Sequence, residues 1–117
     1  MISRAEFESY CMEFAGVTKE YPFDSETAVF KVKGKMFALS NESWEQFKVN
    51  LKCDPEWSMI LREHYDEVEA GWHMNKRHWN TVSFEGKVPD EELLEMVDHS
   101  YRLVVSKLPK SVRERLR

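Results

Sequence analysis

The sequence predicts a two-layer α+β domain in which helices pack on one face of an antiparallel sheet. Apolar residues recur every three to four positions in some segments, as on a helix stripe, and every second position in others, as on one strand face. A chain of 117 residues has the length of a single domain, and its 42% apolar and 32% charged residues are ordinary for a folded protein. We therefore expect a single domain over residues 1–117, with the element order α-β-β-β-α-β-α.

The first helix is predicted from its start and from its apolar stripe. Ser3 and Glu6 have the spacing of a capping box, in which each side chain accepts a hydrogen bond from the other residue's backbone N–H. The stripe that follows has i, i+3, i+4 and i+7 spacing and consists of Phe7, Tyr10, Cys11 and Phe14. Gly16 is suited to end this helix, because glycine readily adopts the left-handed conformation found at helix C-termini.

Three strands are predicted next, because the period changes from 3.6 to 2. Residues 28–33 and 36–40 form two strands around a short hairpin connection at Gly34. In the third strand, apolar and polar side chains alternate from Phe47 to Cys53. Such alternation indicates a sheet with one buried face and one solvated face. The lysines expected on the solvated face are Lys31, Lys33, Lys48 and Lys52.

The remaining predicted elements are a helix, a strand and a long helix. The second helix begins with Asp54 as N-cap and Pro55 in the first turn, and its apolar face consists of Trp57, Ile60 and Leu61. A short strand follows at residues 79–84. The last helix begins near Pro89, and its stripe consists of Leu93, Val97, Tyr101, Val104 and Leu108. Pro109 breaks this helix and leaves a basic tail with room for a final helical turn.

Neither a membrane span nor a secreted disulfide framework is predicted. No apolar run approaches the roughly 20 residues that cross a bilayer, and residues 1–10 contain acids where a signal peptide needs an apolar core. Cys11 and Cys53 are two cysteines far apart, so they form neither a disulfide framework nor the close pair of a zinc site. We expect both to be reduced core residues in a cytoplasmic protein.

The net charge of −4 is unevenly distributed along the chain. Residues 1–70 have 8 basic and 14 acidic side chains, and residues 88–100 have five acidic side chains and no Lys or Arg. By contrast, residues 71–87 have three basic side chains and one acidic, and residues 101–117 have six basic and one acidic. The sequence thus places two basic segments in an otherwise acidic protein.

Residues 70–82, AGWHMNKRHWNTV, lack a clean helical or strand period and concentrate residue types that often carry chemistry. His73 and His78 have a zinc-like spacing, but a partner pair of cysteines is absent, and the two would not share a helix face. We therefore predict no metal site and no cofactor. The chain has no nucleophile elbow, glycine-rich phosphate loop or H-E-x-x-H motif, so we expect a protein that is not an enzyme.

Nucleic acid is the partner that this segment predicts. Lys76 and Arg77 provide phosphate-binding charge, and exposed histidines can stack on bases. The predicted nucleic-acid site combines this segment with the basic tail and consists of His73, Asn75, Lys76, Arg77, His78, Lys110 and Arg113. Because the rest of the chain is acidic, DNA binding is expected to be weak and salt-sensitive.

A module that binds a protein or a small ligand is the alternative. In that case the segment lines a cleft, with Trp72 and Trp79 as walls and Asn75, His73 and His78 as polar contacts. A convex basic surface would favour DNA, and a concave pocket beside the sheet would favour this alternative. On either interpretation we expect a monomer in which the Trp79 ring is buried, because Trp79 begins a strand.

Residues 73–82, HMNKRHWNTV, and residues 88–109, VPDEELLEMVDHSYRLVVSKLP, resemble the MmcQ/YjbR family of small bacterial proteins. The positions that carry the resemblance are His73, Met74, Asn75, Lys76, His78, Trp79, Thr81, Val82, Pro89, Asp90, Ser100, Tyr101, Leu108 and Pro109. The N-terminal YCMEFAGV and YPF also fit the family, so the likeness covers the whole chain. The resemblance implies a CyaY-like or secretion-chaperone-like fold, and DNA binding through a double-wing arrangement.

Overall fold

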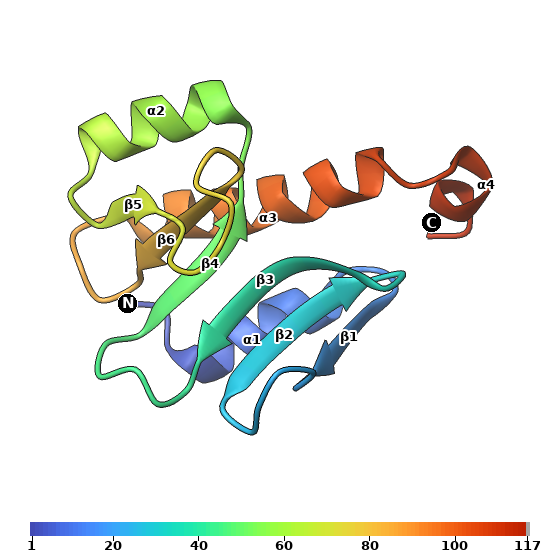
Figure 1. The fold of residues 1–117 in the computed structure, drawn as a ribbon, viewed down its shortest axis with the longest axis horizontal. Coiled ribbons are helices and arrows are strands. Elements are labelled where there is room, and N and C mark those ends of the chain that lie inside the picture. The colour runs from blue at the N-terminus through green and yellow to red at the C-terminus, as the bar shows by residue number, and fades with distance from the viewer. Residues whose placement is uncertain (117) are drawn as a thin grey trace.

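An open six-stranded antiparallel sheet organises residues 1–116, which are the residues that the structure, a computed structural model, describes. In sheet order the strands are β1 (Val17–Glu20), β2 (Thr27–Val32), β3 (Lys35–Asn41), β4 (Lys48–Lys52), β6 (Trp79–Ser83) and β5 (Val68–Ala70). Every neighbouring pair is antiparallel. The two edges of the sheet are therefore formed by β1 and β5 (Figure 1).

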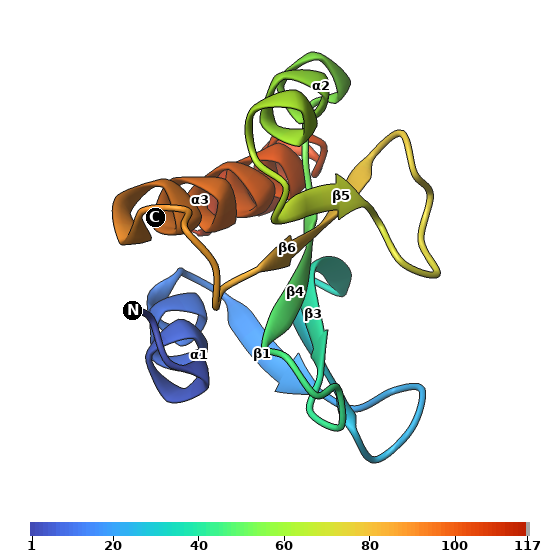
Figure 2. The ribbon, with the colours of Figure 1, turned by 90° about the vertical axis from the view of Figure 1, so that its left-hand side faces the viewer.

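Four helices accompany this sheet within residues 1–116. They are α1 (Arg4–Glu13), α2 (Pro55–His64), α3 (Asp90–Ser106) and α4 (Lys110–Glu114). Figure 2 shows α1 and α3 on the same side of the strands, with the β5–β6 loop projecting from the opposite side. We call that opposite side the helix-free face. In Figure 1, α2 lies beside β5 and α4 lies at the far end of the long axis.

The predicted α+β class with an antiparallel sheet is confirmed, but the predicted element order was incomplete. The structure adds β1 and β5 as edge strands and α4 as the final turn of the tail. These strands have four and three residues, which is too short for a two-residue period to stand out in the sequence. Their conformation depends on pairing with β2 and β6, not on their own pattern.

The core lies between α1, α3 and the adjacent face of the sheet, and Phe7 of α1 occupies its centre. Its ring centroid is 5.5 Å from that of Phe30, 5.7 Å from that of Phe47 and 5.4 Å from that of Phe84. All four rings are buried. The tilted and edge-on arrangement of these rings is the one that aromatic quadrupoles favour, so α1 is fixed on strands that are distant in sequence.

The predicted helix starts are present in the structure. The Ser3 hydroxyl accepts from the Glu6 backbone N–H at 3.1 Å, and the Glu6 carboxylate accepts from the Ser3 N–H at 3.0 Å. At α2, the Asp54 carboxylate accepts from the backbone N–H of Glu56 at 2.9 Å. Both predicted caps therefore satisfy N–H groups that a helix leaves without internal partners.

The predicted apolar face of α2 was wrong at one position. Ile60 is 62% exposed, whereas Ser58 and Leu61 are the buried residues of this helix. The Ser58 hydroxyl accepts a hydrogen bond from the Asn80 side-chain amide of β6 at 3.3 Å. A polar contact with the sheet thus sets the rotation of α2, and apolar spacing alone does not reveal it.

Cys11 and Cys53 are buried free cysteines, as predicted. Burial raises the pKa of both thiols, so both are protonated at neutral pH and pack as small apolar groups. Within residues 1–116, no helix combines the length and the apolarity that crossing a bilayer requires.

Candidate functional site

The segment predicted to bind nucleic acid forms the loop of residues 71–78 between β5 and β6. Several of its groups hold the loop itself together. The Asn75 carbonyl oxygen accepts from the backbone N–H of His78 at 3.2 Å and of Trp79 at 3.0 Å, and its side-chain oxygen accepts from the Arg77 N–H at 2.9 Å. The Lys76 ammonium donates to the Gly71 carbonyl oxygen at 3.1 Å. Asn75 and Lys76 therefore contribute to loop structure.

Arg62 of α2 ties this loop to the helix. Its Nη2 donates to the carbonyl oxygens of Lys76 at 2.5 Å and Trp79 at 3.1 Å, and its Nε donates to the Asn80 side-chain oxygen at 2.8 Å. From the other side, the backbone N–H of Cys53 donates to the His78 carbonyl oxygen at 2.8 Å. No local sequence pattern links Arg62 to a loop that begins nine residues later, so it was missed.

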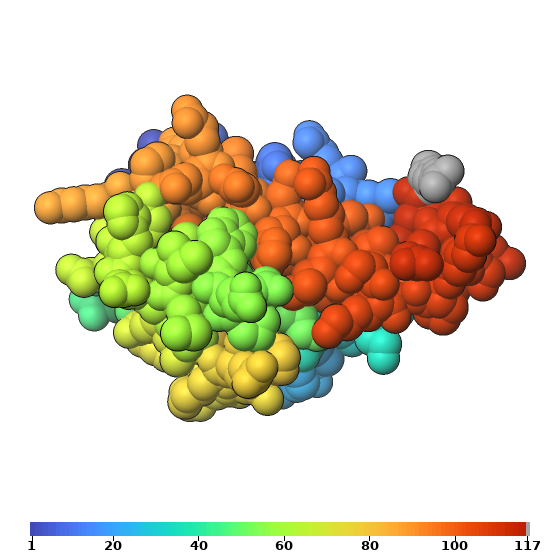
Figure 3. Space-filling model, turned by 90° about the horizontal axis from the view of Figure 1, so that it is seen from above, coloured from blue at the N-terminus to red at the C-terminus, as the bar shows by residue number. Residues whose placement is uncertain are grey.

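The predicted site residues do not form one continuous patch by themselves. His73 and Arg77 are exposed, and their side chains make no hydrogen bond or ion pair within residues 1–116, so both are free to meet a partner. Lys110 and Arg113 are also exposed, but they belong to α4. Figures 1 and 3 both show α4 at one end of the long axis, well separated from the β5–β6 loop.

Lysines of the sheet and of α3 lie between the two predicted basic segments. Lys52, the last residue of β4, pairs in the sheet with Trp79, and its Nζ lies 5.9 Å from the centroid of the Trp79 ring. Lys52 also lines a hollow of about 290 Å³ together with Lys35 and Lys107. We call the whole series the basic track, which consists of Lys76, Arg77, Lys52, Lys35, Lys107, Lys110 and Arg113.

The strand pattern predicts only a solvated side chain for Lys52 and gives no sign of this arrangement. Lys35, Lys52 and Lys107 are brought together by the packing of α3 across β3 and β4. In Figure 3 the yellow β5–β6 loop, the cyan hairpin atoms and the red C-terminal segment follow the lower edge of the molecule. The basic track was therefore visible only in three dimensions.

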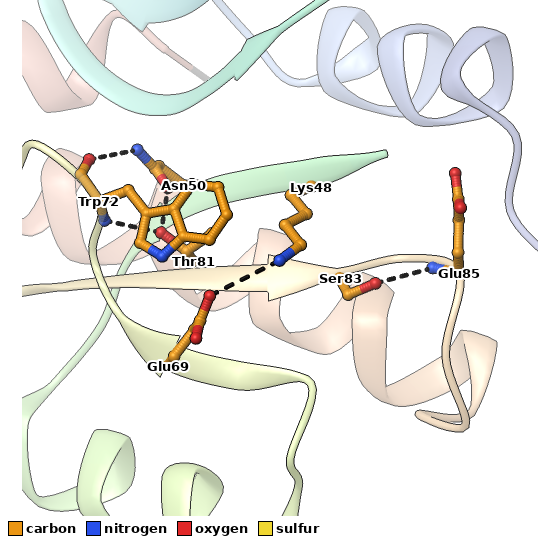
Figure 4. A network of polar contacts seen from close by, with 7 residues as sticks. All are labelled: Lys48, Asn50, Glu69, Trp72, Thr81, Ser83 and Glu85. Carbon is orange, nitrogen blue, oxygen red and sulfur yellow. Dashed lines mark hydrogen bonds and ion pairs between the residues drawn. The ribbon is translucent and has the colours of Figure 1, made fainter. Parts of the chain in front are cut away.

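A buried polar network fixes Trp72 on the helix-free face (Figure 4). Asn50 of β4 accepts from the Thr81 hydroxyl at 2.5 Å and donates to the Trp72 carbonyl oxygen at 3.1 Å. The Thr81 hydroxyl accepts in turn from the Trp72 N–H at 2.8 Å. Asn50 and Thr81 are 1% and 0% exposed, so this network supplies the hydrogen bonds that buried polar groups require.

Trp72 lines a hollow on this face, whereas Trp79 is buried as predicted. The ring centroids of Trp44 and Trp72 lie 5.4 Å apart, and the Lys48 Nζ lies 4.2 Å from the Trp72 centroid. Lys48 also pairs with Glu69 at 3.6 Å. We call the two adjoining hollows, of about 330 and 370 Å³, the aromatic–acidic groove, which is lined by Trp44, Glu45, Gln46, Lys48, Asp66, Glu67, Glu69, Trp72, Ser83, Glu85 and Gly86.

Among residues 1–116, no group of three or more His, Cys, Asp or Glu side chains is arranged to hold a metal ion. His99 instead supports the start of α2, because its Nε2 accepts from the Asp54 backbone N–H at 3.0 Å. Burial lowers the pKa of His99, although the carboxylates of Asp54 and Glu95 oppose this effect. The ring is therefore uncharged at neutral pH, as an acceptor at Nε2 must be.

Similar proteins were found by sequence. The YjbR family model matches residues 12–103. A protein of Escherichia coli K12 described as uncharacterized protein YjbR is 34% identical over 112 residues, which cover 96% of this chain and 95% of the relative. Uncharacterized protein YbdF of Escherichia coli O157:H7 is 37% identical over 97 residues, covering 83% of this chain and 80% of the relative. These descriptions name no enzymatic activity.

Solved structures agree with the sequence relatives. The crystal structure of Deinococcus radiodurans protein DR2400, with the domain DUF419, matches with a TM-score of 0.91 and 37% identity, covering 99% of this chain and 88% of that chain. A crystal structure from Pseudomonas syringae matches with a TM-score of 0.75 and 25% identity, covering 86% of this chain and 97% of that chain. The resemblance carried by the HMNKRHW motif is confirmed, and the chain belongs to the YjbR family.

Proposed function

We propose that the protein binds nucleic acid through the basic track. The observation that carries this proposal is the hollow lined by Lys35, Lys52 and Lys107, which has no acidic residue in its lining. Lys52 pairs in the sheet with Trp79, which follows the β5–β6 loop, and Lys107 precedes Lys110 of α4 by three residues. These placements support a binding surface that includes both basic segments of the sequence. Neutralisation of phosphates by Lys and Arg supplies most of the non-specific affinity of proteins for nucleic acid.

The acidic surfaces restrict where a nucleic acid can approach. The aromatic–acidic groove has five acidic residues and one lysine in its lining, so it repels phosphates. With a net charge of −4, the protein is expected to bind DNA weakly, with a dissociation constant of roughly 10⁻⁴ to 10⁻⁶ M for non-specific sequence.

Replacing Lys35 and Lys107 together with glutamine should weaken duplex binding and flatten its salt dependence. Each lost phosphate contact reduces the slope of log affinity against log salt concentration by about 0.9, so two lost contacts reduce it by about 1.8. The measurement is fluorescence anisotropy of a labelled DNA duplex between about 50 and 200 mM salt.

The double variant Lys19→Gln/Lys87→Gln is the matched control, because it has the same net charge but leaves the basic track intact. Lys19 lies on β1 and forms an ion pair with Glu8 at 3.0 Å, and Lys87 lies in the connection between β6 and α3. We expect its slope to equal that of the wild type. Equal slopes for the two double variants, or no binding by the wild type at the lowest salt concentration, would contradict the proposal.

The aromatic–acidic groove supports a second candidate function, the binding of a cationic ligand. The groove already holds one ammonium group, that of Lys48, between the Trp72 ring and the Glu69 carboxylate. An aromatic ring combined with a carboxylate is a favourable environment for a cation, and Trp44 adds a second ring. This version of the ligand-binding alternative uses Trp72 of the predicted segment, but not Trp79, Asn75 or the two histidines.

Spermine is a suitable probe for this second function. We expect the Trp44→Leu variant to bind spermine about two- to thirtyfold more weakly than the wild type, as loss of one cation–π contact of ~0.5–2 kcal/mol predicts. Trp57→Leu is the control, since Trp57 lies on α2 and does not line the groove. Isothermal titration calorimetry decides between the outcomes, and equal affinity of both variants would exclude the groove as the cation site.

A further inference from the structure

The lysine-lined hollow lies where three elements of the fold meet. Lys35 begins β3, Lys52 ends β4 and Lys107 is the C-cap of α3. The buried side chains of Val104 and Leu108 complete its lining. Its volume of about 290 Å³ is roughly ten times the ~30 Å³ that one water molecule takes in the liquid, so it can admit a phosphate group.

The three lysines have no counter-charge within residues 1–116. None of the ion pairs formed by these residues includes Lys35, Lys52 or Lys107. The pKa of Lys52 is lowered by burial and then by the nearby positive charges of Lys107 and Lys35. Like charges gathered in a hollow repel one another, and a bound anion would remove this repulsion.

A single buried serine holds the three sides of the hollow in place. Ser100 of α3 is 0% exposed, and its hydroxyl accepts from the Lys52 backbone N–H at 2.9 Å. The same hydroxyl donates to the Phe37 carbonyl oxygen of β3. Ser100 thus joins α3 to β3, which begins with Lys35, and to β4, which ends with Lys52. The hollow is therefore formed before a ligand arrives, which lowers the entropic cost of binding.

The charge of the hollow favours the end of a nucleic-acid strand over its middle. A phosphodiester inside a strand carries one negative charge and continues in two directions. A phosphate monoester carries about −1.5 to −2 charges at neutral pH, has three acceptor oxygens and is attached on one side only. Three ammonium groups around one hollow match the phosphate monoester better than the phosphodiester in both charge and shape.

We infer that the hollow of Lys35, Lys52 and Lys107 binds a phosphate monoester, namely the terminal phosphate of a nucleic-acid strand. The inference rests on the proposed function for the source of this phosphate, but not for the chemistry of its recognition. A terminal phosphate seated here would place the following nucleotides along the remainder of the basic track.

The test compares two short DNA duplexes of the same sequence, one with 5′-phosphates and one with 5′-hydroxyl ends. Wild-type protein should bind the phosphorylated duplex about tenfold more tightly, which corresponds to ~1.4 kcal/mol. The Lys52→Gln variant should lose this preference, and Lys52→Arg, which keeps the charge, should retain much of it. Lys31→Gln is the control, because Lys31 is another half-buried strand lysine but pairs with Glu20 at 3.3 Å.

The outcomes separate this inference from the proposed function. If the protein binds both duplexes with equal affinity and in a salt-dependent way, the inference that the hollow binds a terminal phosphate is contradicted. The proposal of nucleic-acid binding would then stand. If neither duplex binds, ribose 5-phosphate is tested by its effect on the melting temperature. A rise in wild type but not in Lys52→Gln would keep the pocket, with a small phosphorylated molecule as its ligand, and overturn nucleic-acid binding. No rise would overturn both.

Discussion

The Phe7→Ala variant is expected to lose about 3–5 kcal/mol of its free energy of unfolding, a large share of the stability of a domain this size. Phe7 is 1% exposed and contacts the rings of Phe30, Phe47 and Phe84. Truncation removes these contacts and leaves a cavity between α1, β2 and the residues that flank β4 and β6. The hydrogen-bonded sheet cannot shift easily to fill this cavity. Urea denaturation followed by circular dichroism measures the loss.

Phe23→Ala is the matched control for this prediction. Phe23 is 64% exposed in the connection between β1 and β2, so the same change of side chain should alter the free energy of unfolding by less than about 0.5 kcal/mol. Similar losses in the two variants would contradict the placement of α1 at the centre of the core.

The Trp79→Ala variant should also lose about 3–5 kcal/mol, because the Trp79 ring is 6% exposed. Its backbone closes the β5–β6 loop, where the Trp79 carbonyl oxygen accepts from the Gly71 N–H at 2.8 Å and from Arg62 at 3.1 Å. Gly71 fits closely against it, since a Cβ on Gly71 would lie 2.8 Å from the Trp79 Cβ. The alanine variant keeps these backbone contacts but loses the buried ring where the loop joins β6, so we expect the loop to loosen together with the global loss of stability.

Trp57→Ala provides the comparison for Trp79→Ala. Trp57 is only half-buried on α2, where its ring lies 4.7 Å from that of His99, so its truncation should cost less. The measurement is again the urea midpoint, together with the hydrogen exchange of the Trp79 N–H, which donates to Asn75. An unchanged midpoint in Trp79→Ala would contradict the structural role assigned to this tryptophan.

The helices were predictable because their signals are local. The Ser3–Glu6 capping box, the Asp54 N-cap and the stripe around Val97 each lie within a few residues of the element that they define. The edge strands were not predictable, because three or four residues do not show a period and become strands only by pairing with a neighbour. The rotation of α2 was misjudged for a related reason, since Ser58 contacts Asn80 of a strand 22 residues away.

The candidate sites likewise contain residues that the sequence predicts and residues that only the folded structure brings together. The basic residues of the β5–β6 loop and of α4 stood out as charge clusters in the sequence. Lys35, Lys52 and Lys107 did not, because they are separated by 17 and 55 positions and meet only through the packing of α3 on the sheet. The hollow of Trp72 likewise depends on Trp44, which comes from the distant β3–β4 connection.

The two sheet edges also bear on how the protein behaves when it is concentrated. An open sheet has unpaired N–H and C=O groups along its outer strands, and these can recruit a strand from another molecule. Here β5 offers only three residues beside α2, and β1 offers four, with the charges of Lys19 and Glu20 each paired within the chain. Edges this short and charged offer few backbone groups for hydrogen bonding with a strand of another molecule. The fold itself therefore disfavours the formation of intermolecular β-sheet.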